Sequence, residues 1–332
     1  RIAWEYTDED LGLPTTDDSV QNKENKNSNN DTDQTSITSV FGRVGYSYMD
    51  KYYGDVSFRY DGSVNFAPKN RWGFFPSASL AWRVSEEKFF KENVKFINYL
   101  KLRTSIGLLG NDGIVLKDKN AISGWQWMQR YNLVNGAYFG SLSSGVAADV
   151  IPNVDITWEK SLTYNFGLDA TFLNNKLSMT VDAFYRHTYD ILGDRAASIP
   201  ATFGAKMPSE NYGVIDARGF EVELGYNDRI GDDFKYYVKG NLGYAVNEVI
   251  TKDEAENLRS YKSEIGYSTD RKMGYIATDI IRTQADLDAL PEGYTIFGQK
   301  PELGMLNYKD LRGANSDEPD GVIDDNDKDW II

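Results

Sequence analysis

The feature that most constrains this chain is strict alternation of apolar and polar residues over unusually long segments. The clearest case is residues 72–84, whose apolar face has tryptophan near both ends and consists of Trp72, Phe74, Ala78, Leu80, Trp82 and Val84. The opposite face is small or polar, and only Phe75 breaks the pattern. A period of two with one apolar face is what a half-buried antiparallel strand requires. This strand is about twice as long as the five or six residues usual in soluble proteins.

The same alternation predicts eight strands, at 40–48, 52–61, 72–84, 100–109, 158–173, 176–188, 219–227 and 234–247. The connections after the first, fifth and seventh strands are short. The segment 85–99 is intermediate in length and has room for a short helix. The remaining connections are long and polar: 62–71, 110–157, 189–218 and everything after 248. Short connections therefore collect at one end of the strands and long ones at the other.

This asymmetry is typical of transmembrane β-barrels, which have strands near ten residues, short turns on one side and long loops on the other. Such barrels carry girdles of Tyr and Trp at the two water interfaces. Residues that fit these girdles are Tyr46, Tyr48, Trp72, Trp82, Trp158, Tyr185 and Tyr226. We therefore expect the apolar face to pack against lipid. A large soluble jelly roll or solenoid is the alternative.

The polar face of the predicted strands carries many charges: Arg43, Arg59, Arg83, Lys101, Arg103, Asp169, Asp182, Arg186, Glu221, Glu223, Lys235 and Lys239. A small closed barrel with a dry interior would have to pair and hydrogen-bond every one of them. A wide lumen filled with water or a plug can hold them. The pattern favours a large barrel of which these eight strands are one part.

Composition excludes several classes of function. The 332 residues contain no Cys and one His, so a thiolate or His-rich metal site and a cysteine nucleophile are excluded. The formal net charge of −14 argues against nucleic-acid binding. No signal peptide is visible in the first residues and neither end resembles a natural terminus, so we expect a piece of a longer chain.

Several long segments resemble the SusC/RagA-type TonB-dependent outer-membrane transporters. Among them are "RYDGSVNFAPKNRWGFFPSASLAWRVSEEKFF" (59–90), "LKLRTSIGLLGND" (100–112) and "SIPATFGAKMPSENYG" (198–213). Residues 156–192, 218–227 and 274–288 show the same similarity. The resemblance covers nearly everything after residue 38. It implies an all-β, antiparallel barrel of about 22 strands, with long extracellular loops and short periplasmic turns, in the outer membrane of a Gram-negative bacterium.

The resemblance also implies a domain plan and a function. Residues 1–38 would be an extracellular loop segment, 39–247 eight barrel strands with their loops, and 248–332 a long extracellular loop region. A plug domain and the last strands would lie outside this chain. The implied function is import of oligosaccharides, or else peptides, with a SusD-like surface lipoprotein and with energy from the TonB–ExbB–ExbD system. A non-transporting adhesin, a glycan-binding β-protein and a passive porin are the alternatives.

The late acidic loop 316–329 is a candidate ion site. Its second half follows the pattern of an EF-hand-like loop, with Asp320, a glycine, a hydrophobic residue, Asp324 and then Asp327 as the acid at position twelve. The first half departs from the pattern, because position one falls on Ser316 and position three on Glu318. An insertion could instead recruit Asp310. A Ca²⁺ site formed by Glu318, Asp320, Asp324 and Asp327 stands against a solvated acidic loop.

The long loop 110–157 is a candidate substrate platform. It contains five aromatic residues near amides such as Gln126 and Asn132: Trp125, Trp127, Tyr131, Tyr138 and Phe139. Exposed aromatic rings beside amides can bind sugar rings. The simpler alternative is that they pack the loop against its neighbours, since long ordered loops need small cores of their own.

Catalysis is not predicted. His187 lies by parity on the apolar face near the outer rim, and nothing near it in the sequence resembles a nucleophile elbow. We expect His187 to pack at the membrane interface and the protein not to be an enzyme.

Overall fold

The computed structural model describes residues 36–112, 126–129, 131–138, 142–148, 150–195, 207–231 and 233–331. The chain divides into two compact units, Arg1–Asn257 and Leu258–Ile332. Each unit is described by itself.

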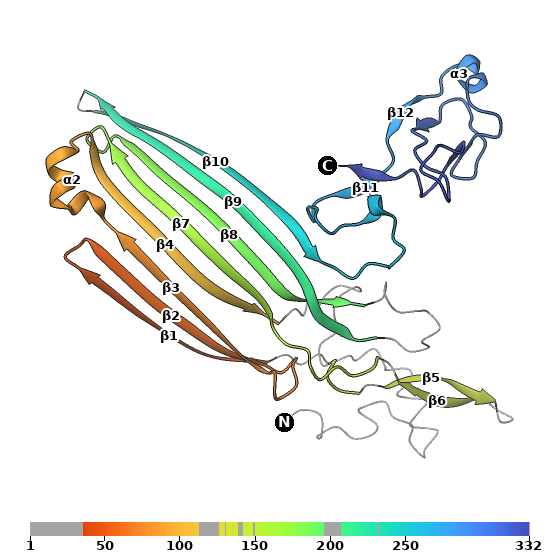
Figure 1. The fold of residues 1–332 in the computed structure, drawn as a ribbon, viewed down its shortest axis with the longest axis horizontal. Helices are drawn as coiled ribbons and strands as arrows, with labels where there is room; N and C mark the ends of the chain where they lie inside the picture. The colour runs from red at the N-terminus through yellow and green to blue at the C-terminus, as the bar shows by residue number, and fades with distance from the viewer. Residues whose placement is uncertain are drawn as a thin grey trace. The chain divides into compact units, whose positions relative to one another are not determined.

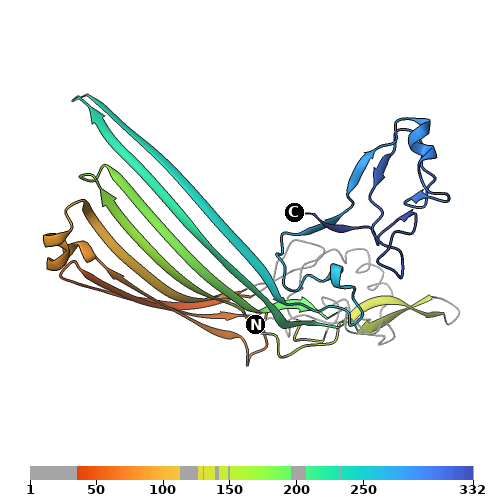
Figure 2. The ribbon, with the colours of Figure 1, turned by 45° about the horizontal axis from the view of Figure 1, so that its top comes forward.

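The first unit is built on one antiparallel sheet of eight long strands that pair in chain order (Figure 1). Its strands are β1 (Ile37–Tyr48), β2 (Tyr52–Ser63), β3 (Trp72–Trp82), β4 (Ile97–Asn111), β7 (Glu159–Phe172), β8 (Leu177–Asp194), β9 (Ser209–Ile230) and β10 (Phe234–Thr251). All eight predicted strands are present, and the all-β antiparallel class is confirmed. The sheet is open in the described chain, because β1 and β10 do not pair with each other, and Figure 2 shows that it is curved.

The predicted short connections are tight turns at one end of the sheet. After β1, Lys51 N–H donates to the Tyr48 carbonyl (3.0 Å), and Met49 and Asp50 take positive φ angles of 54° and 55°. Such angles suit a hairpin turn whose twist matches that of the flanking strands. The segment between β3 and β4 is longer and holds a 3₁₀ turn, η1 (Val84–Glu86), and the short helix α2 (Lys88–Asn93), as the sequence allowed.

Strands β8 and β9 run further toward the long loops than the sequence predicted. Their pairing continues to Asp194↔Ser209, past register shifts between Thr188 and Ile191 and between Ile191 and Leu192. A bulge places an extra residue on one strand and so resets which residues share a face. The apolar–polar alternation used to predict the strands is therefore lost at the bulge, although the hydrogen-bonded ladder continues past it.

A small buried core lies where β3 and β4 separate beyond the pair Ser77↔Gly107. It consists of Phe66, Phe75, Ile156, Trp158 and Leu192. The ring of Phe75, which broke the alternation, lies so close to Gly110 that a Cβ there would come within 1.9 Å of it. The girdle position expected for Trp158 is wrong: the indole is buried against Phe66 and Phe75 and donates to the Arg71 carbonyl (3.0 Å).

The long loop between β4 and β7 contains a hairpin that the sequence did not predict, formed by β5 (Tyr131–Tyr138) and β6 (Leu142–Ala148). The pairing shifts register between Asn135 and Tyr138, so the hairpin lacks a continuous period of two.

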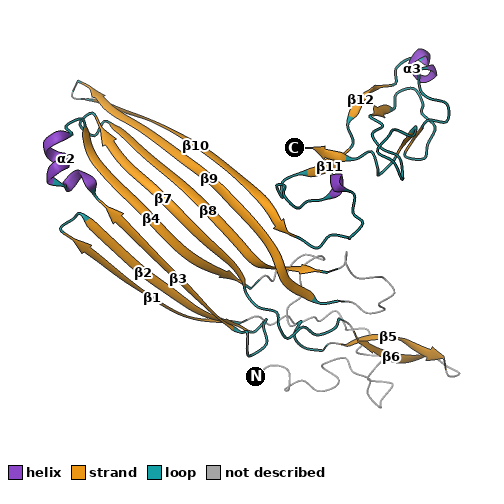
Figure 3. Cartoon of the chain, in the orientation of Figure 1, coloured by secondary structure: helices purple, strands orange, loops and turns teal. Residues whose placement is uncertain are grey.

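The second unit is small and loop-rich, as the teal segments of Figure 3 show. Its elements are η3 (Ser260–Lys262), β11 (Lys272–Gly274), β12 (Ala277–Ile280), α3 (Gln284–Asp288), β13 (Thr295–Ile296), β14 (Leu306–Tyr308), β15 (Val322–Ile323) and β16 (Asp329–Ile331). Thr283 begins α3 with a capping box shared with Asp286. The unit has its own core of Ile281, Tyr294, Ile296 and Ile323.

Candidate functional site

The polar face of the sheet carries a hollow of about 510 Å³ that reaches from β1 to β7. The polar and charged side chains that line it alternate with the apolar face in every strand: Arg43, Tyr53, Asp55, Ser79, Lys101, Arg103, Ser105 and Asn165. We call this surface the inner face. Arg43, Lys101 and Arg103 are among the charges that the alternation predicted for one interior.

Most charges of the inner face are paired. Arg103 on β4 donates through Nε to Asp169 (2.8 Å) and through Nη2 to both Asp169 and Asp182 (3.0 Å each). The Arg43 Nε–Asp55 Oδ2 distance is 2.7 Å. Charged hydrogen bonds of this kind are stronger than neutral ones and hold the side chains in place.

Gly167 makes the Arg103 network possible. It lies between the two carboxylates, opposite Arg103 on β4 and Asp182 on β8. A Cβ at this position would lie 2.6 Å from the guanidinium carbon and 2.7 Å from an Asp182 oxygen. Only a residue without a side chain lets the guanidinium cross the strand here.

The other face of the same strands is apolar and exposed. Residues that show this, one from each strand of the sheet in order, are Val44, Val56, Leu80, Ile106, Tyr164, Tyr185, Leu224 and Leu242. At the end with the long loops, Tyr60 and Trp72 stack with ring centroids 4.9 Å apart. We call this surface the outward face. An apolar band of this size is rare on soluble monomers and marks a surface that another medium or molecule covers.

The aromatic residues predicted to bind sugar are only partly described. Trp125 and Phe139 lie outside the described residues, and Tyr138 is placed in β5 without a described side chain. Trp127 is half-buried and its indole donates to the Val64 carbonyl (3.4 Å), whereas Tyr131 on β5 is exposed. A sugar platform stays a prediction, with Tyr131 as its accessible described residue.

Sequence reasoning missed how this loop is attached to the sheet. Gln126 is buried, and its side chain donates to Ser209 Oγ (3.1 Å) and accepts from Ser209 N–H (2.8 Å). Asn153 donates to the Ser209 carbonyl (3.0 Å). Two amide side chains thus tie the loop to the start of β9. A single amide residue in a polar loop gives no pattern by which these contacts could be found.

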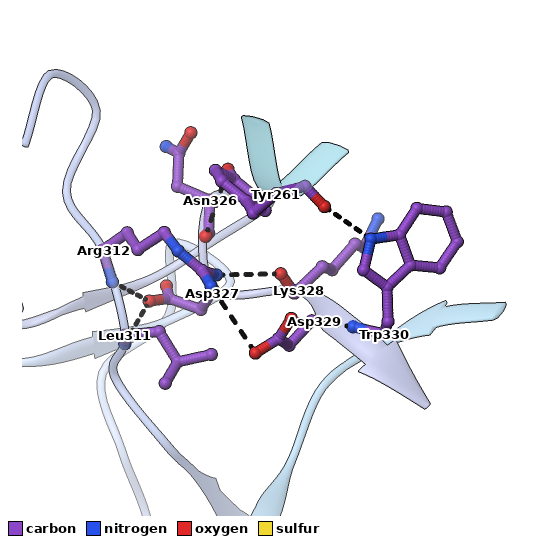
Figure 4. Close-up of polar contacts among 8 residues, drawn as sticks. All are labelled: Tyr261, Leu311, Arg312, Asn326, Asp327, Lys328, Asp329 and Trp330. Carbon is purple, nitrogen blue, oxygen red and sulfur yellow. Dashed lines mark hydrogen bonds and ion pairs between the residues drawn. The ribbon is translucent and has the colours of Figure 1, made fainter. Parts of the chain in front are cut away.

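The acidic loop of the second unit is organised around Asp327. Its buried carboxylate accepts hydrogen bonds from the backbone N–H groups of Leu311 (2.7 Å), Arg312 (3.0 Å) and Asp324 (2.9 Å). Figure 4 shows the first two, together with Arg312, which donates to the Lys328 carbonyl (3.2 Å). Asp327 therefore joins two stretches of backbone that are distant in sequence.

Two other acidic residues of the loop, and Asp310 before it, also accept hydrogen bonds from backbone N–H groups. Asp320 accepts from Val322 N–H (3.0 Å), and Asp324 from Asn326 N–H (2.7 Å). Asp310 accepts from Gly321 N–H (2.7 Å), and burial raises the pKa of its carboxyl. Glu318 is exposed at the surface. Within the described residues, no three acidic or histidine side chains are grouped as metal ligands. The Ca²⁺ site stays a prediction.

His187 lies on β8 with its ring beside that of Tyr189, at a centroid distance of 5.4 Å. Its Nδ1 is 2.6 Å from Asp216 Oδ1, and Tyr185 donates to the other oxygen of the same carboxyl (2.8 Å). Asp216 on β9 thus binds both Tyr185 and His187 on β8, and this contact holds the His187 ring against the surface of the sheet.

Among the described residues, no helix is long and apolar enough to cross a membrane. A family model described as "TonB dependent receptor-like, beta-barrel" matches residues 2–320. TonB-dependent receptor P39 of Formosa agariphila is 30% identical over 301 residues, which cover 84% of this chain and 28% of that protein. TonB-dependent receptor SusC of Bacteroides thetaiotaomicron is 31% identical over 255 residues, 73% of this chain and 24% of that protein.

The solved structures agree on the fold. The RagAB peptide importer in its 'open-open' state superimposes with a TM-score of 0.66 at 22% identity, over 90% of this chain and 29% of that chain. In the two sequence comparisons above, the chain spans only 28% of the length of receptor P39 and 24% of the length of SusC.

A long-stranded antiparallel sheet with one exposed apolar face and one charged face is the wall of an outer-membrane β-barrel. The chain belongs to the TonB-dependent receptor β-barrel family and is of the SusC/RagA type. The family consists of receptors and transporters. The predicted resemblance is confirmed.

Proposed function

We propose that the full protein imports oligosaccharides across the outer membrane, with energy from the TonB–ExbB–ExbD system and with a SusD-like lipoprotein at the surface. The observation that carries the proposal is the division of the sheet into an apolar outward face and a charged inner face with a hollow. Side chains that are charged and fixed on the inner face suit a polar passage or a polar plug. Family membership supports energy coupling through TonB.

Peptides are the second substrate class. The specific observation in their favour is the similarity in fold to the RagAB peptide importer. Oligosaccharides are favoured by exposed aromatic rings such as Tyr131 in the loop between β4 and β7, since rings of this kind stack on sugar faces.

The acidic loop 316–329, with a Ca²⁺ ion held by Glu318, Asp320, Asp324 and Asp327, would be an accessory to the extracellular region rather than part of the transport path.

The test is uptake by cells of the source bacterium. A strain without the full-length gene, a strain without TonB and the parent would be compared for growth on oligosaccharides and on peptides as sole carbon source. We expect both deletions to abolish growth on the same substrate class. Uptake that persists without TonB would indicate a passive porin, and surface binding without uptake an adhesin.

A matched pair of variants would locate substrate contact. Tyr131→Ala removes an exposed ring in the loop between β4 and β7, and Tyr267→Ala removes an exposed ring in the second unit. If Tyr131 contacts sugar, only the first variant raises the oligosaccharide concentration needed for half-maximal uptake. Equal effects of the two variants would contradict a role for Tyr131 in binding.

A further inference from the structure

The connection between β3 and β4 differs from the other connections at its end of the sheet. The turns after β1, β7 and β9 are tight, whereas this connection contains η1 and α2 and lies beyond the strand ends (Figure 1). We call residues 84–96 the rim connector.

Glu87 fixes the rim connector to the outward side of the sheet. Its carboxylate accepts hydrogen bonds from Tyr52 Oη (2.6 Å), Trp82 Nε1 (3.2 Å) and Lys51 Nζ (3.0 Å). Tyr52 and Trp82 are opposite each other in the β2–β3 pairing and belong to the outward face. The backbone adds a bond from Arg83 N–H to the Lys51 carbonyl (2.7 Å).

The rim connector exposes two phenylalanines although a third is buried. Phe90 packs inside, but Phe89 is 56% exposed and Phe96 69% exposed. Large apolar side chains that remain exposed next to a buried one mark a surface that contacts something other than water, such as a membrane or another protein. Glu87, two residues before Phe89, is bound to Tyr52 and Trp82 of the outward face, so the medium that covers that face reaches the start of α2.

The rim connector also carries lysines near the exposed phenylalanines. Lys88, Lys91 and Lys95 are all exposed. Lys91 is bound to Glu86 at 2.5 Å. In the described part of the chain, neither Lys88 nor Lys95 has a carboxylate within ion-pair distance. Lysines beside exposed aromatics are typical of segments that lie at a membrane surface, where the ammonium groups meet lipid phosphates.

We propose that the rim connector is a membrane-surface anchor, in which Phe89 and Phe96 insert at the boundary of head groups and acyl chains of the inner leaflet while Lys88 and Lys95 contact lipid phosphates. The inference rests on the proposed function, because it needs the sheet to be a barrel wall in the outer membrane. The anchor extends the apolar band of the outward face beyond the strand ends and holds the sheet at a fixed depth in the membrane.

The test is depth measurement by nitroxide labels in the full-length protein, reconstituted into vesicles of phosphatidylethanolamine and phosphatidylglycerol in a ratio of three to one. Single labels would be placed by Phe89→Cys, Phe96→Cys, Leu80→Cys and Glu92→Cys. Leu80 lies on the outward face of β3, two residues before Trp82, and Glu92 is an exposed polar residue of α2. Collisions with oxygen report lipid, and collisions with a water-soluble nickel chelate report water.

We expect the oxygen-to-nickel accessibility ratio at 89 and 96 to exceed that at 92 several-fold and to lie below that at 80. Lys88→Gln with Lys95→Gln should reduce the ratio at 89, and more so in vesicles with phosphatidylglycerol than without it. Phe89→Ser with Phe96→Ser should leave the label at 80 unchanged, which shows that the wall itself still inserts.

Three outcomes would overturn the anchor. Labels at 89 and 96 that are open to nickel while the label at 80 is in lipid would reject the anchor and leave the barrel intact. Labels at 89 and 96 that are closed to both reagents would show that a protein covers the connector. A label at 80 that is open to nickel would reject the barrel wall, and the anchor with it.

Discussion

The sheet of the first unit and the second unit use apolar residues in opposite ways. On the sheet, large aliphatic side chains point outward, and Leu80 is 64% exposed. In the second unit, Ile281, Ile296 and Ile323 turn inward to form a core, and Ile323 is 0% exposed. The strands satisfy their backbone through the ladder and leave their apolar face for lipid. The second unit has only short ladders among its described residues and packs a core of its own.

The difference teaches where each part is vulnerable. The wall depends on its hydrogen-bonded register and on the polarity of each face. On the outward face it therefore tolerates a change in side-chain volume better than the replacement of an apolar side chain by a charged one. The second unit has little regular structure, so it depends on a few buried residues that tie separate segments together. Four predictions test this contrast.

The largest effect is expected in the second unit from Asp327→Ala. The carboxylate is 0% exposed and holds three backbone N–H groups, which the alanine would leave without partners. The loss is about 3–5 kcal/mol, since each unsatisfied buried donor costs about 1–3 kcal/mol. Hydrogen exchange of the full-length protein should show faster exchange throughout 306–331 and unchanged exchange in β1–β4. Asp317→Ala, at an exposed position, is the control, and equal effects of the two would refute the role of Asp327.

The second prediction compares two neighbours on β3. Leu80→Arg places a charge on the lipid side and should cost about 1–3 kcal/mol, because Leu80 lies two residues from Trp82 at the interface and the cost of arginine falls from about 2–4 kcal/mol at the bilayer midplane toward the interfaces. Ser79→Arg places the same charge on the inner face, beside the hollow, and should cost less than about 1 kcal/mol. Urea titrations in vesicles, read by gel mobility, would measure both. Equal costs would mean that the two faces meet the same medium.

The two regions also differ in how far the sequence predicts them. The faces of the strands follow from alternation, because the pleat imposes a period of two. Pattern reading ended at the bulges near Ile191, and it placed Trp158 at the interface although Phe66 covers it. The break at Phe75 was the visible sign of that core.

The site was harder to predict because its contacts join residues that are distant in the sequence. The alternation placed Arg103 and both of its carboxylates on one face, yet only the register shows that they meet across Gly167. For Asp327, the sequence shows an acidic loop and suggests an ion, whereas its oxygens bind backbone at Leu311 and Arg312. The number of carboxylates predicts neither their burial nor their partners.

The third prediction concerns the pairing on the inner face. Arg103→Gln removes a cation shared by two carboxylates and should cost about 1 kcal/mol, the upper end for ion pairs with partial exposure. Arg43→Gln, at a guanidinium far more exposed than that of Arg103, should cost less than about 0.5 kcal/mol. Gly167→Ala should act like Arg103→Gln because it displaces the guanidinium. The same urea titrations apply, and a larger effect at Arg43 would contradict this ranking.

The smallest effect is local and depends on pH. Hydrogen bonds from Tyr52, Lys51 and Trp82 lower the pKa of Glu87 from the ordinary value of 4.5 to about 2. A carboxyl whose pKa is lower in the folded state stabilises that state fully above pH 4.5 and loses this effect as the pH falls toward 2. A nitroxide at Phe89 should therefore keep its mobility down to about pH 3 and become more mobile near pH 2. Glu87→Gln should make the label mobile at every pH while the urea midpoint of the wall stays the same. Release of the label near pH 4.5 in the parent would show that the three donors do not hold Glu87, and the rim connector would then need another attachment to the wall.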